Sequence, residues 1–379
     1  MNLLMKYAAA GLLAAFFVTV TPRPLSADPA NDQYVQVNLV SDLAGVAEHT
    51  DPNLVNPWGV SFSGTSPFWV SNQGSNTSTL YDGAGNINSL VVSIPPVGTG
   101  GKGPTGQVFA NIANNFVLKN GTAATFIFDT LDGQILGWNG AAGTTAVNMV
   151  TTPGAVYTGL AIAQTGGNNF IYAANTRGSI DVFNSSFTNV SSTTFAGKFV
   201  DPSPLAGFTP YNIQAINGNL YVTYASTTAT TTNPGGFVDE FAADGTFIKR
   251  IATSGPLNAA WGITLAPSNF GVFSNDLLIG NFGNGEILAY DPNGTNAFLG
   301  TLDALNGNPI VDSGLWALDF RTGGTNDLLN GLYITAGLDN QQHGLFAVIE
   351  VAPEPGTLGL LGLALLAGGA TARLRRRSR

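Results

Sequence analysis

Apolar and polar residues alternate in short stretches throughout the middle of the chain. The first clear group of such stretches starts at Pro57, at Phe68 and at Ser78, and it ends in the turn Asp82-Gly83. Alternation with a period of two is typical of strands that bury one face, and no helical period runs through these stretches. The middle of the chain is therefore predicted to be all-β.

The same order of three strands returns along the chain. Two further copies are clear, with predicted strands at residues 159–163, 170–175 and 179–183 and at residues 261–265, 276–281 and 286–290. Three weaker copies bring the total to six, at a spacing of about 50 residues. Asp-Gly and Asn-Gly pairs separate the strands, as expected where tight hairpins need residues that tolerate positive φ. The repetition indicates one architecture made of six similar sheets.

Six short antiparallel sheets in a ring bury their faces on one another and leave little exposed edge, which is the principle of a β-propeller. We therefore predict a six-bladed β-propeller of four-stranded antiparallel blades over residues 28–351. The strand-like segment from Tyr34 to Val40 is expected to add the outer strand of the last blade and close the ring. A pair of β-sandwiches or a β-helix is the alternative, although neither explains three or four strands per repeat as directly.

The first 27 residues have the layout of a secretory signal peptide. Lys6 precedes an apolar run from Ala8 to Val18, and small residues follow near Ser26-Ala27, where cleavage is expected. The alternative is an uncleaved anchor, but the apolar run is shorter than the roughly 20 residues that a spanning helix needs. The chain is therefore predicted to be exported.

The C-terminal segment, residues 352–379, is also distinctive. The triplet Pro353-Glu354-Pro355 is followed by an uncharged stretch from Gly356 to Ala372, which as a helix would span about 25 Å, just short of a typical hydrocarbon core. Five arginines come after it: Arg373, Arg375, Arg376, Arg377 and Arg379. A positive cluster stays cytoplasmic and so would place the preceding domain outside the membrane. The alternative is a buried core helix, which a terminal arginine cluster does not favour.

Composition excludes several classes of function. The chain has no cysteine, so disulfides, thiolate metal sites and a cysteine nucleophile play no part. Half of the 14 Lys and Arg lie in the two end segments, whereas Glu354 is the only one of the 23 Asp and Glu found there. The middle section is therefore strongly acidic and would repel a phosphate backbone, so no nucleic-acid partner is expected.

Few residues suit nucleophilic or phosphate chemistry. His49 and His343 are the only histidines, both in polar surroundings typical of exposed loops, and the chain has no G-x-S-x-G motif. The glycine-rich segment around Lys102 has Gly103 where a phosphate loop would place Ser or Thr. We interpret that segment as a loop between blades.

A central channel is the remaining place for a site. In a propeller, the starts of the innermost strands and the ends of the next strands surround this channel, and here those positions are rich in Asn and Trp. The candidate binding residues are Asn56, Trp58, Asn72, Asn175, Asn212, Trp261, Asn281 and Trp316. Carboxamides can bind sugar hydroxyls or a divalent cation such as calcium, and indoles stack on sugar faces. The alternative is a structural role in packing the blades, and no cofactor is otherwise predicted.

The repeats resemble those of NHL-type and gluconolactonase-like six-bladed propellers. The resemblance covers nearly all of residues 34–351 and rests on a P-W-G-V type opening, as at Pro57 to Val60, followed by two strands of fixed pattern. It implies a divalent metal in the channel, held by a carboxylate and asparagines. The chain has the asparagines, but the first inner strand carries no glutamate.

The tail closely resembles the PEP-CTERM sorting signal of Gram-negative bacteria. Pro353-Glu354-Pro355, the apolar stretch and the arginine cluster carry the resemblance, with Ala352 where valine is usual. It implies export, transient retention in the inner membrane and processing near the triplet by an exosortase, commonly in bacteria that make exopolysaccharide. The released protein would be periplasmic, at the cell surface or extracellular.

Two functions follow as hypotheses. The first is an exported, cell-surface or matrix-associated binding or scaffold protein whose partner is an extracellular polysaccharide or another surface protein. The alternative is a metal-dependent hydrolase or lyase of the gluconolactonase kind, acting on lactones or polysaccharide-derived sugars. A carboxylate with several converging oxygen ligands in the channel would favour the enzyme.

Overall fold

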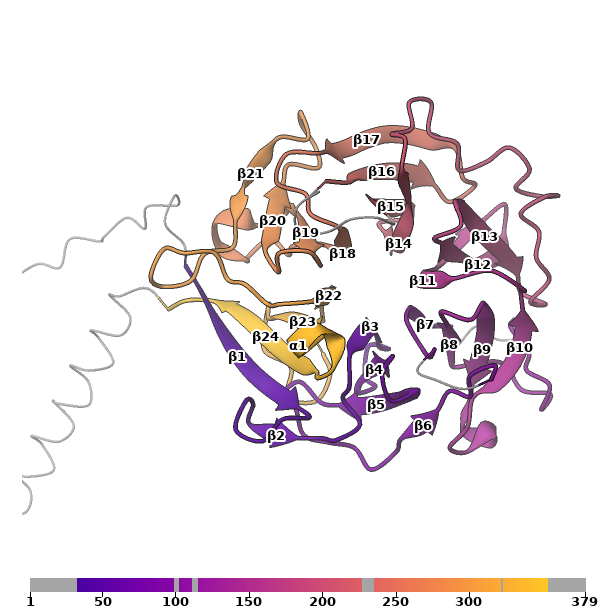
Figure 1. The fold of residues 1–379 in the computed structure, drawn as a ribbon, viewed down its shortest axis with the longest axis horizontal. Helices are drawn as coiled ribbons and strands as arrows, with labels where there is room; N and C mark the ends of the chain where they lie inside the picture. Colours follow the sequence, from indigo (N-terminus) through magenta and orange to yellow (C-terminus); the bar gives the residue numbers. More distant parts are fainter. Residues whose placement is uncertain (1–32, 99–101, 111–114, 227–234, 322, 354–379) are drawn as a thin grey trace, which may run out of the picture. The chain divides into compact units, whose positions relative to one another are not determined.

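Six antiparallel sheets surround a common axis in the computed structural model (Figure 1). The structure describes residues 33–98, 102–110, 115–226, 235–321 and 323–353, and residues 29–352 form one compact unit. The predicted signal peptide, Glu354, Pro355, the apolar tail and the arginine cluster lie outside the described residues. Among the residues that are described, no helix is long and apolar enough to span a membrane.

Each sheet is one blade, and its first strand lies nearest the axis. Blade 1 consists of β3 (Pro57–Ser61), β4 (Phe68–Asn72), β5 (Thr77–Tyr81) and β6 (Val92–Ser93). Blade 2 consists of β7 (Gln107–Phe109), β8 (Phe126–Asp129), β9 (Gln134–Trp138) and β10 (Val147–Thr151). Blade 3 consists of β11 (Tyr157–Thr165), β12 (Asn168–Asn175) and β13 (Ser179–Asn184).

The second half of the chain continues the ring in the same direction. Blade 4 consists of β14 (Phe208–Ile216), β15 (Asn219–Ser226), β16 (Phe237–Ala242) and β17 (Phe247–Thr253). Blade 5 consists of β18 (Ala260–Leu265), β19 (Leu277–Asn281), β20 (Ile287–Tyr290) and β21 (Phe298–Thr301). The predicted six-bladed, all-β architecture is confirmed.

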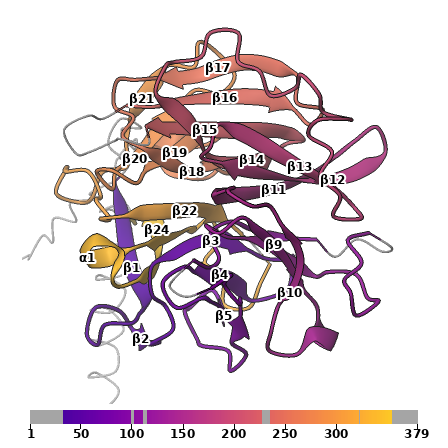
Figure 2. The ribbon, with the colours of Figure 1, turned by 45° about the vertical axis from the view of Figure 1, so that its right-hand side comes forward.

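Blade 6 joins the two ends of the propeller. Its inner strands are β22 (Leu315–Phe320), β23 (Leu332–Ala336) and β24 (Leu345–Val351), and β1 (Tyr34–Ser41) pairs antiparallel with β24 (Figures 1 and 2). The two-residue strand β2 (His49–Thr50) lies parallel to β1 at the outer edge. The prediction that the segment starting at Tyr34 closes the ring is confirmed, and closure protects the edge of β24.

Blade 3 has three strands where four were expected. In the described residues, the fourth position holds only one isolated bridge, between Phe183 and Asn189. The Ser191 hydroxyl accepts a hydrogen bond from the Val182 N–H at 2.8 Å, and the Asn189 side chain accepts from the Ser191 N–H at 3.0 Å. Such side-chain bonds offer the backbone an alternative to a strand ladder. This local competition explains why the strand stops after one pair.

In the part of the chain that the structure describes, helical structure is confined to single turns. Two 3-10 turns, η2 (Gly140–Ala142) and η3 (Gly271–Phe273), lie in loops. The short element α1 (Leu338–Gln341) contains Asp339 and Asn340 with φ of 49° and 55°, so it is a left-handed turn rather than a standard helix.

A small residue on most inner strands lets neighbouring blades approach closely. A Cβ atom on Gly59 would lie 2.6 Å from the Thr105 carbonyl oxygen of the next blade, and one on Gly106 would overlap the backbone at Leu160. Real Cβ atoms do not come that close, so only glycine fits at these contacts. The repeated opening Trp-Gly or Thr-Gly is therefore explained by the packing of inner strands around the axis.

Candidate binding site in the central channel

Aromatic side chains close the channel at the end where the inner strands begin. Trp58 on β3 stacks on Trp316 on β22 with 3.5 Å between ring centroids, and Trp261 on β18 lies edge-on to both. All three are at most 5% exposed. Phe282 stacks on Trp316 at 4.3 Å, and Tyr211 lies beside it. This end is therefore a packed core that joins blades far apart in the sequence.

Hydrogen bonds fix the closed end. The Trp261 indole N–H donates to the Thr158 carbonyl at 2.8 Å, which connects blade 5 to blade 3 across the axis. Trp316 donates to the Asn56 side-chain oxygen at 3.1 Å. Asn212 on β14 donates to the Trp261 carbonyl at 2.8 Å. The structure thus brings together five of the eight channel candidates: Asn56, Trp58, Asn212, Trp261 and Trp316.

The other three candidates hold turns within their own blades. Asn175 accepts from the Val156 N–H at 3.2 Å, and Asn281 accepts from the Asn258 N–H at 2.9 Å, each just before an inner strand. Asn72 donates to Thr79 at 2.9 Å. These three carboxamides are buried and satisfy local polar groups. Binding of a ligand by any of the eight residues stays a prediction.

The channel is open at the opposite end, where the inner strands finish. A cavity of about 230 Å³ lies between the later residues of β3, β7, β11, β14 and β22. Deeper in, the channel narrows, and the space there has a volume of about 20 Å³. That is roughly the volume needed to hold one water molecule. We call the wider part the mouth cavity. Apolar side chains such as Val60, Val108, Leu160 and Ile162 line it, but polar atoms make up the larger share of its accessible surface.

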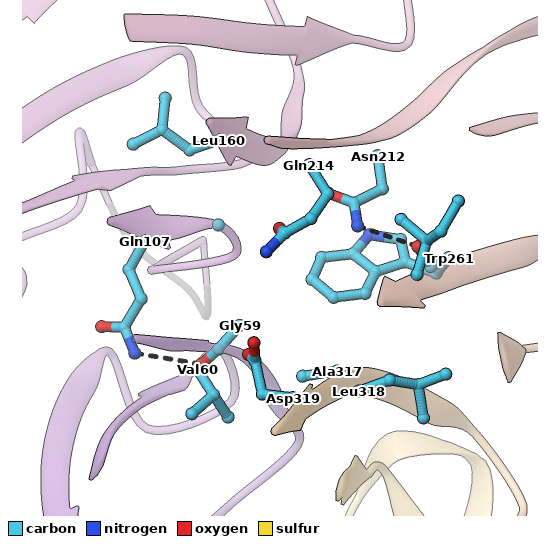
Figure 3. A pocket seen from close by; sticks show the side chains of 12 residues that line it. Gly59, Val60, Gln107, Leu160, Asn212, Gln214, Trp261, Ala317, Leu318 and Asp319 are labelled. Carbon is cyan, nitrogen blue, oxygen red and sulfur yellow. Dashed lines mark hydrogen bonds between the residues drawn. The ribbon is translucent and has the colours of Figure 1, made fainter. Parts of the chain in front are cut away.

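Two polar side chains in the mouth cavity lack partners. Asp319 of β22 and Gln214 of β14 line both the wide and the narrow part, and both side chains point into it (Figure 3). Within the described residues, neither side chain forms a hydrogen bond or an ion pair. By contrast Gln107, at the same level, donates to the carbonyl oxygens of Gly59 and Trp69 and is held by them. Asp319 and Gln214 are therefore free to meet a ligand.

Burial raises the pKa of Asp319 to about 8. The carboxyl touches the cavity but is otherwise surrounded by protein, and no positive group faces it from the residues that line the cavity. A perturbed carboxyl in a concave site is a mark of functional sites. Sequence reasoning missed this residue. The signal was the single charge in the otherwise apolar strand LWALDF.

The histidines and the glycine-rich loop lie away from this cavity. His343 lies in a loop, as expected, but it is half-buried with its Nδ1 2.7 Å from the Asp42 carboxylate. His49 lies on the two-residue strand β2 and is also half-buried. Lys102 is exposed in the connection between blades 1 and 2, as predicted. In the part of the chain that the structure describes, no three His, Cys, Asp or Glu side chains gather as a metal site would require.

Asp129 lies behind the channel wall and makes folding sensitive to pH. Burial raises the pKa of Asp129 to about 7, although hydrogen bonds from Thr105 and Gly106 act in the opposite direction. Between about pH 4 and pH 7 the folded chain therefore keeps a proton that the unfolded chain has lost. The free energy of unfolding should fall as pH rises through this window, by up to about 1.4 kcal/mol per pH unit for this one group.

Urea unfolding at pH 5 and at pH 7 checks this expectation. The substitution Asp129→Asn keeps an oxygen acceptor for Thr105 and removes the titration, so the variant should show a flatter dependence on pH than the parent chain. Equal pH dependence in the two proteins would contradict the assignment to Asp129.

The fold and the mouth cavity define a six-bladed β-propeller, a class generally used for binding or as a scaffold. No protein-family model matches the chain. It is 31% identical over 332 residues to uncharacterized protein R648 of Acanthamoeba polyphaga mimivirus, which covers 82% of this chain and 78% of that protein. It is 30% identical over 336 residues to uncharacterized protein L690 of the same virus, with 81% and 83% covered. The chain therefore belongs to the family of R648 and L690.

Two further likenesses are more limited. Uncharacterized protein R640 of the same virus is 32% identical over 216 residues, which is 52% of this chain and 40% of that protein. Among solved structures, BBS1N in complex with ARL6DN, soaked with lead, aligns with a TM-score of 0.40 and 12% identity over 76% of each chain.

Proposed function

We propose that this chain is an exported binding or scaffold propeller that takes its ligand in the mouth cavity. The observation that carries the proposal is that Asp319 and Gln214 face this cavity without protein partners. A largely buried carboxylate without a partner destabilises the folded state by several kcal/mol unless something binds it. At the closed end of the same channel, Asn212, Trp261 and Trp316 are hydrogen-bonded and covered by aromatic rings, and only the Trp58 indole N–H lacks a partner among the described residues of that aromatic group. The contrast supports a binding role for the open end.

The alternative function, a metal-dependent hydrolase or lyase, gains no specific support from the described channel. Asp319 is the single carboxylate among the residues that line it. A calcium ion takes six to eight oxygen ligands, and the neighbouring Gln107 is already engaged with two carbonyl groups. The binding proposal is therefore the one we develop.

A titration with four classes of small molecule tests the proposal. The purified full-length chain in mild detergent is titrated calorimetrically with a primary amine, a neutral polyol, a carboxylate and Ca²⁺. The variant Gln214→Trp, which places a bulky side chain at a position that points into the mouth cavity, serves as the blocked control. We expect at least one class to bind the parent chain and not the blocked variant. Binding that is absent throughout, or unaffected by the block, would overturn the proposal.

The location of the two chain ends supports the proposed sorting of the protein. Strand β24 ends at Val351, and the Ala352 N–H donates to the Gln33 carbonyl at 2.7 Å. Blade 6 is therefore complete before the Pro-Glu-Pro triplet begins, and removal of the flanking segments leaves the ring closed. In this proposal an exosortase-type enzyme processes a chain held in the inner membrane, and the released propeller binds an extracellular polysaccharide or another surface protein.

Replacing Pro353, Glu354 and Pro355 by alanine is predicted to leave export intact and to trap the protein in the membrane fraction. The apolar stretch and the arginines still hold the chain, but the processing site is gone. Fractionation of a Gram-negative host that carries an exosortase measures this. Release equal to that of the parent chain would contradict the sorting role.

A further inference from the structure

The mouth cavity has one ionisable side chain and no positively charged one among the residues that line it. Among the residues that line it, Asp319 alone can ionise. Arg321 is two residues further along the chain, but it is paired with Asp327 and therefore unavailable. Asp129 bonds to Gly106 behind the wall and does not line the cavity. The ionised carboxylate thus needs a cation from outside the chain.

The polar atoms of the cavity indicate how many donors that cation should have. The Asp319 carboxylate offers two acceptor oxygens, and the Gln214 carboxamide offers a third. A primary ammonium group has three N–H donors, which matches this set. A guanidinium has five donors in a rigid plane, which is two more than the acceptors that these two side chains offer. A divalent metal would lack most of its oxygen ligands.

The walls and the volume indicate the rest of the ligand. Val60, Val108, Leu160 and Ile162 contribute apolar surface beside these two polar groups, although polar atoms make up the larger share of the cavity surface. The cavity of about 230 Å³ is smaller than the roughly 300 Å³ at which pockets for drug-sized ligands begin. A short ligand with a polar head and few carbon atoms therefore suits this cavity better than a large apolar one.

We infer that the mouth cavity binds a primary alkylammonium group, with its nitrogen between Asp319 and Gln214. The group comes either from a free small amine or from a lysine side chain of a partner protein. The inference rests on the proposed binding function and names the class of ligand. The strongly acidic surface of the propeller favours the approach of cations in either case.

The ligand needs the ionised form of Asp319, so affinity should depend on pH. Burial holds the carboxyl protonated below about pH 8, while an alkylammonium stays charged up to about pH 10. No other titratable side chain from the six inner strands lines the cavity. The dissociation constant should therefore fall by about tenfold between pH 6 and pH 7 and level off above about pH 8.

Calorimetric titration of the full-length chain with n-butylammonium tests the inference. Butan-1-ol, which has the same alkyl chain without the charge, is the matched probe. Glu48→Gln is the matched control variant, because it removes an exposed carboxylate outside the mouth cavity. We expect n-butylammonium to bind at pH 9 and butan-1-ol not to bind. Asp319→Asn should weaken binding by at least about tenfold, and Glu48→Gln should leave it unchanged.

Gln214→Leu gives a second route should Asp319→Asn fail to fold, and it should weaken binding several-fold. Titration with Nα-acetyl-lysine amide distinguishes a free small amine from a lysine of a partner protein as the source of the ammonium group. A lysine of a partner must enter the cavity with its backbone attached, and this probe carries that backbone. Binding of n-butylammonium that both variants leave unchanged would overturn the inference. A polyol or carboxylate that binds in place of the amine would overturn it while the proposed function stands. Absence of binding by every class would overturn both.

Discussion

Replacing Asp327 by alanine is expected to lower the free energy of unfolding by about 3–5 kcal/mol. The Arg321 and Asp327 side chains are 2% and 4% exposed, and Arg321 Nε lies 2.9 Å from Asp327 Oδ2. Arg321 also donates to the Ser66 carbonyl and lies over the Phe68 ring at 3.7 Å, so it joins blade 6 to blade 1. Without Asp327, a buried guanidinium loses its counterion, which is the source of the large effect.

The double variant Arg321→Met and Asp327→Leu separates the charge from the packing. It removes both ions and keeps apolar volume, so most of the stability should return. Urea unfolding followed by tryptophan fluorescence compares the three proteins. If Asp327→Ala lies within 1 kcal/mol of the parent chain, the pair does not hold these two blades together.

Replacing Trp316 by alanine should also cost about 3–5 kcal/mol of unfolding free energy, as expected for the loss of a buried aromatic side chain. The change removes the stack on Trp58 and leaves the Asn56 oxygen without its indole donor. Trp316→Phe is the matched control, because it keeps an aromatic ring and should cost clearly less. The same unfolding assay measures both variants.

The Trp316 variants also test whether the closed end of the channel and the mouth cavity act independently. Since Trp316 belongs to the closed end, Trp316→Phe should not alter binding of n-butylammonium in the mouth cavity. Equal destabilisation by phenylalanine and alanine would show that the stack with Trp58 contributes little. A large change in amine binding would show that the two ends act as one site.

The blades could be predicted from the sequence because each one repeats local requirements. A strand must alternate apolar and polar residues, its hairpins need residues such as Asp and Gly, and the inner strands need a small residue where the next blade comes close, as at Gly59 and Gly106. The closing strand at Tyr34 could be found for the same reason, since a ring has to cover its last edge.

The position of the site could not be predicted in the same way. Whether a Trp lines an open channel or closes it depends on contacts between distant blades, such as the hydrogen bond from Trp261 to Thr158, 103 residues apart. Asp319 stands in an apolar strand, and no local rule shows that Gln214 lies in the same cavity. The three-stranded blade 3 likewise reflects two local side-chain hydrogen bonds, those accepted by Ser191 and by Asn189.

A crystal structure of the full-length chain with n-butylammonium at pH 9 tests the central claim most directly. We predict electron density for the probe in the mouth cavity, with its nitrogen about 2.7–3.1 Å from an Asp319 carboxylate oxygen and from the Gln214 side-chain oxygen. Density only at the outer surface, or an Asp319 carboxylate paired with a side chain of the protein itself, would contradict the account.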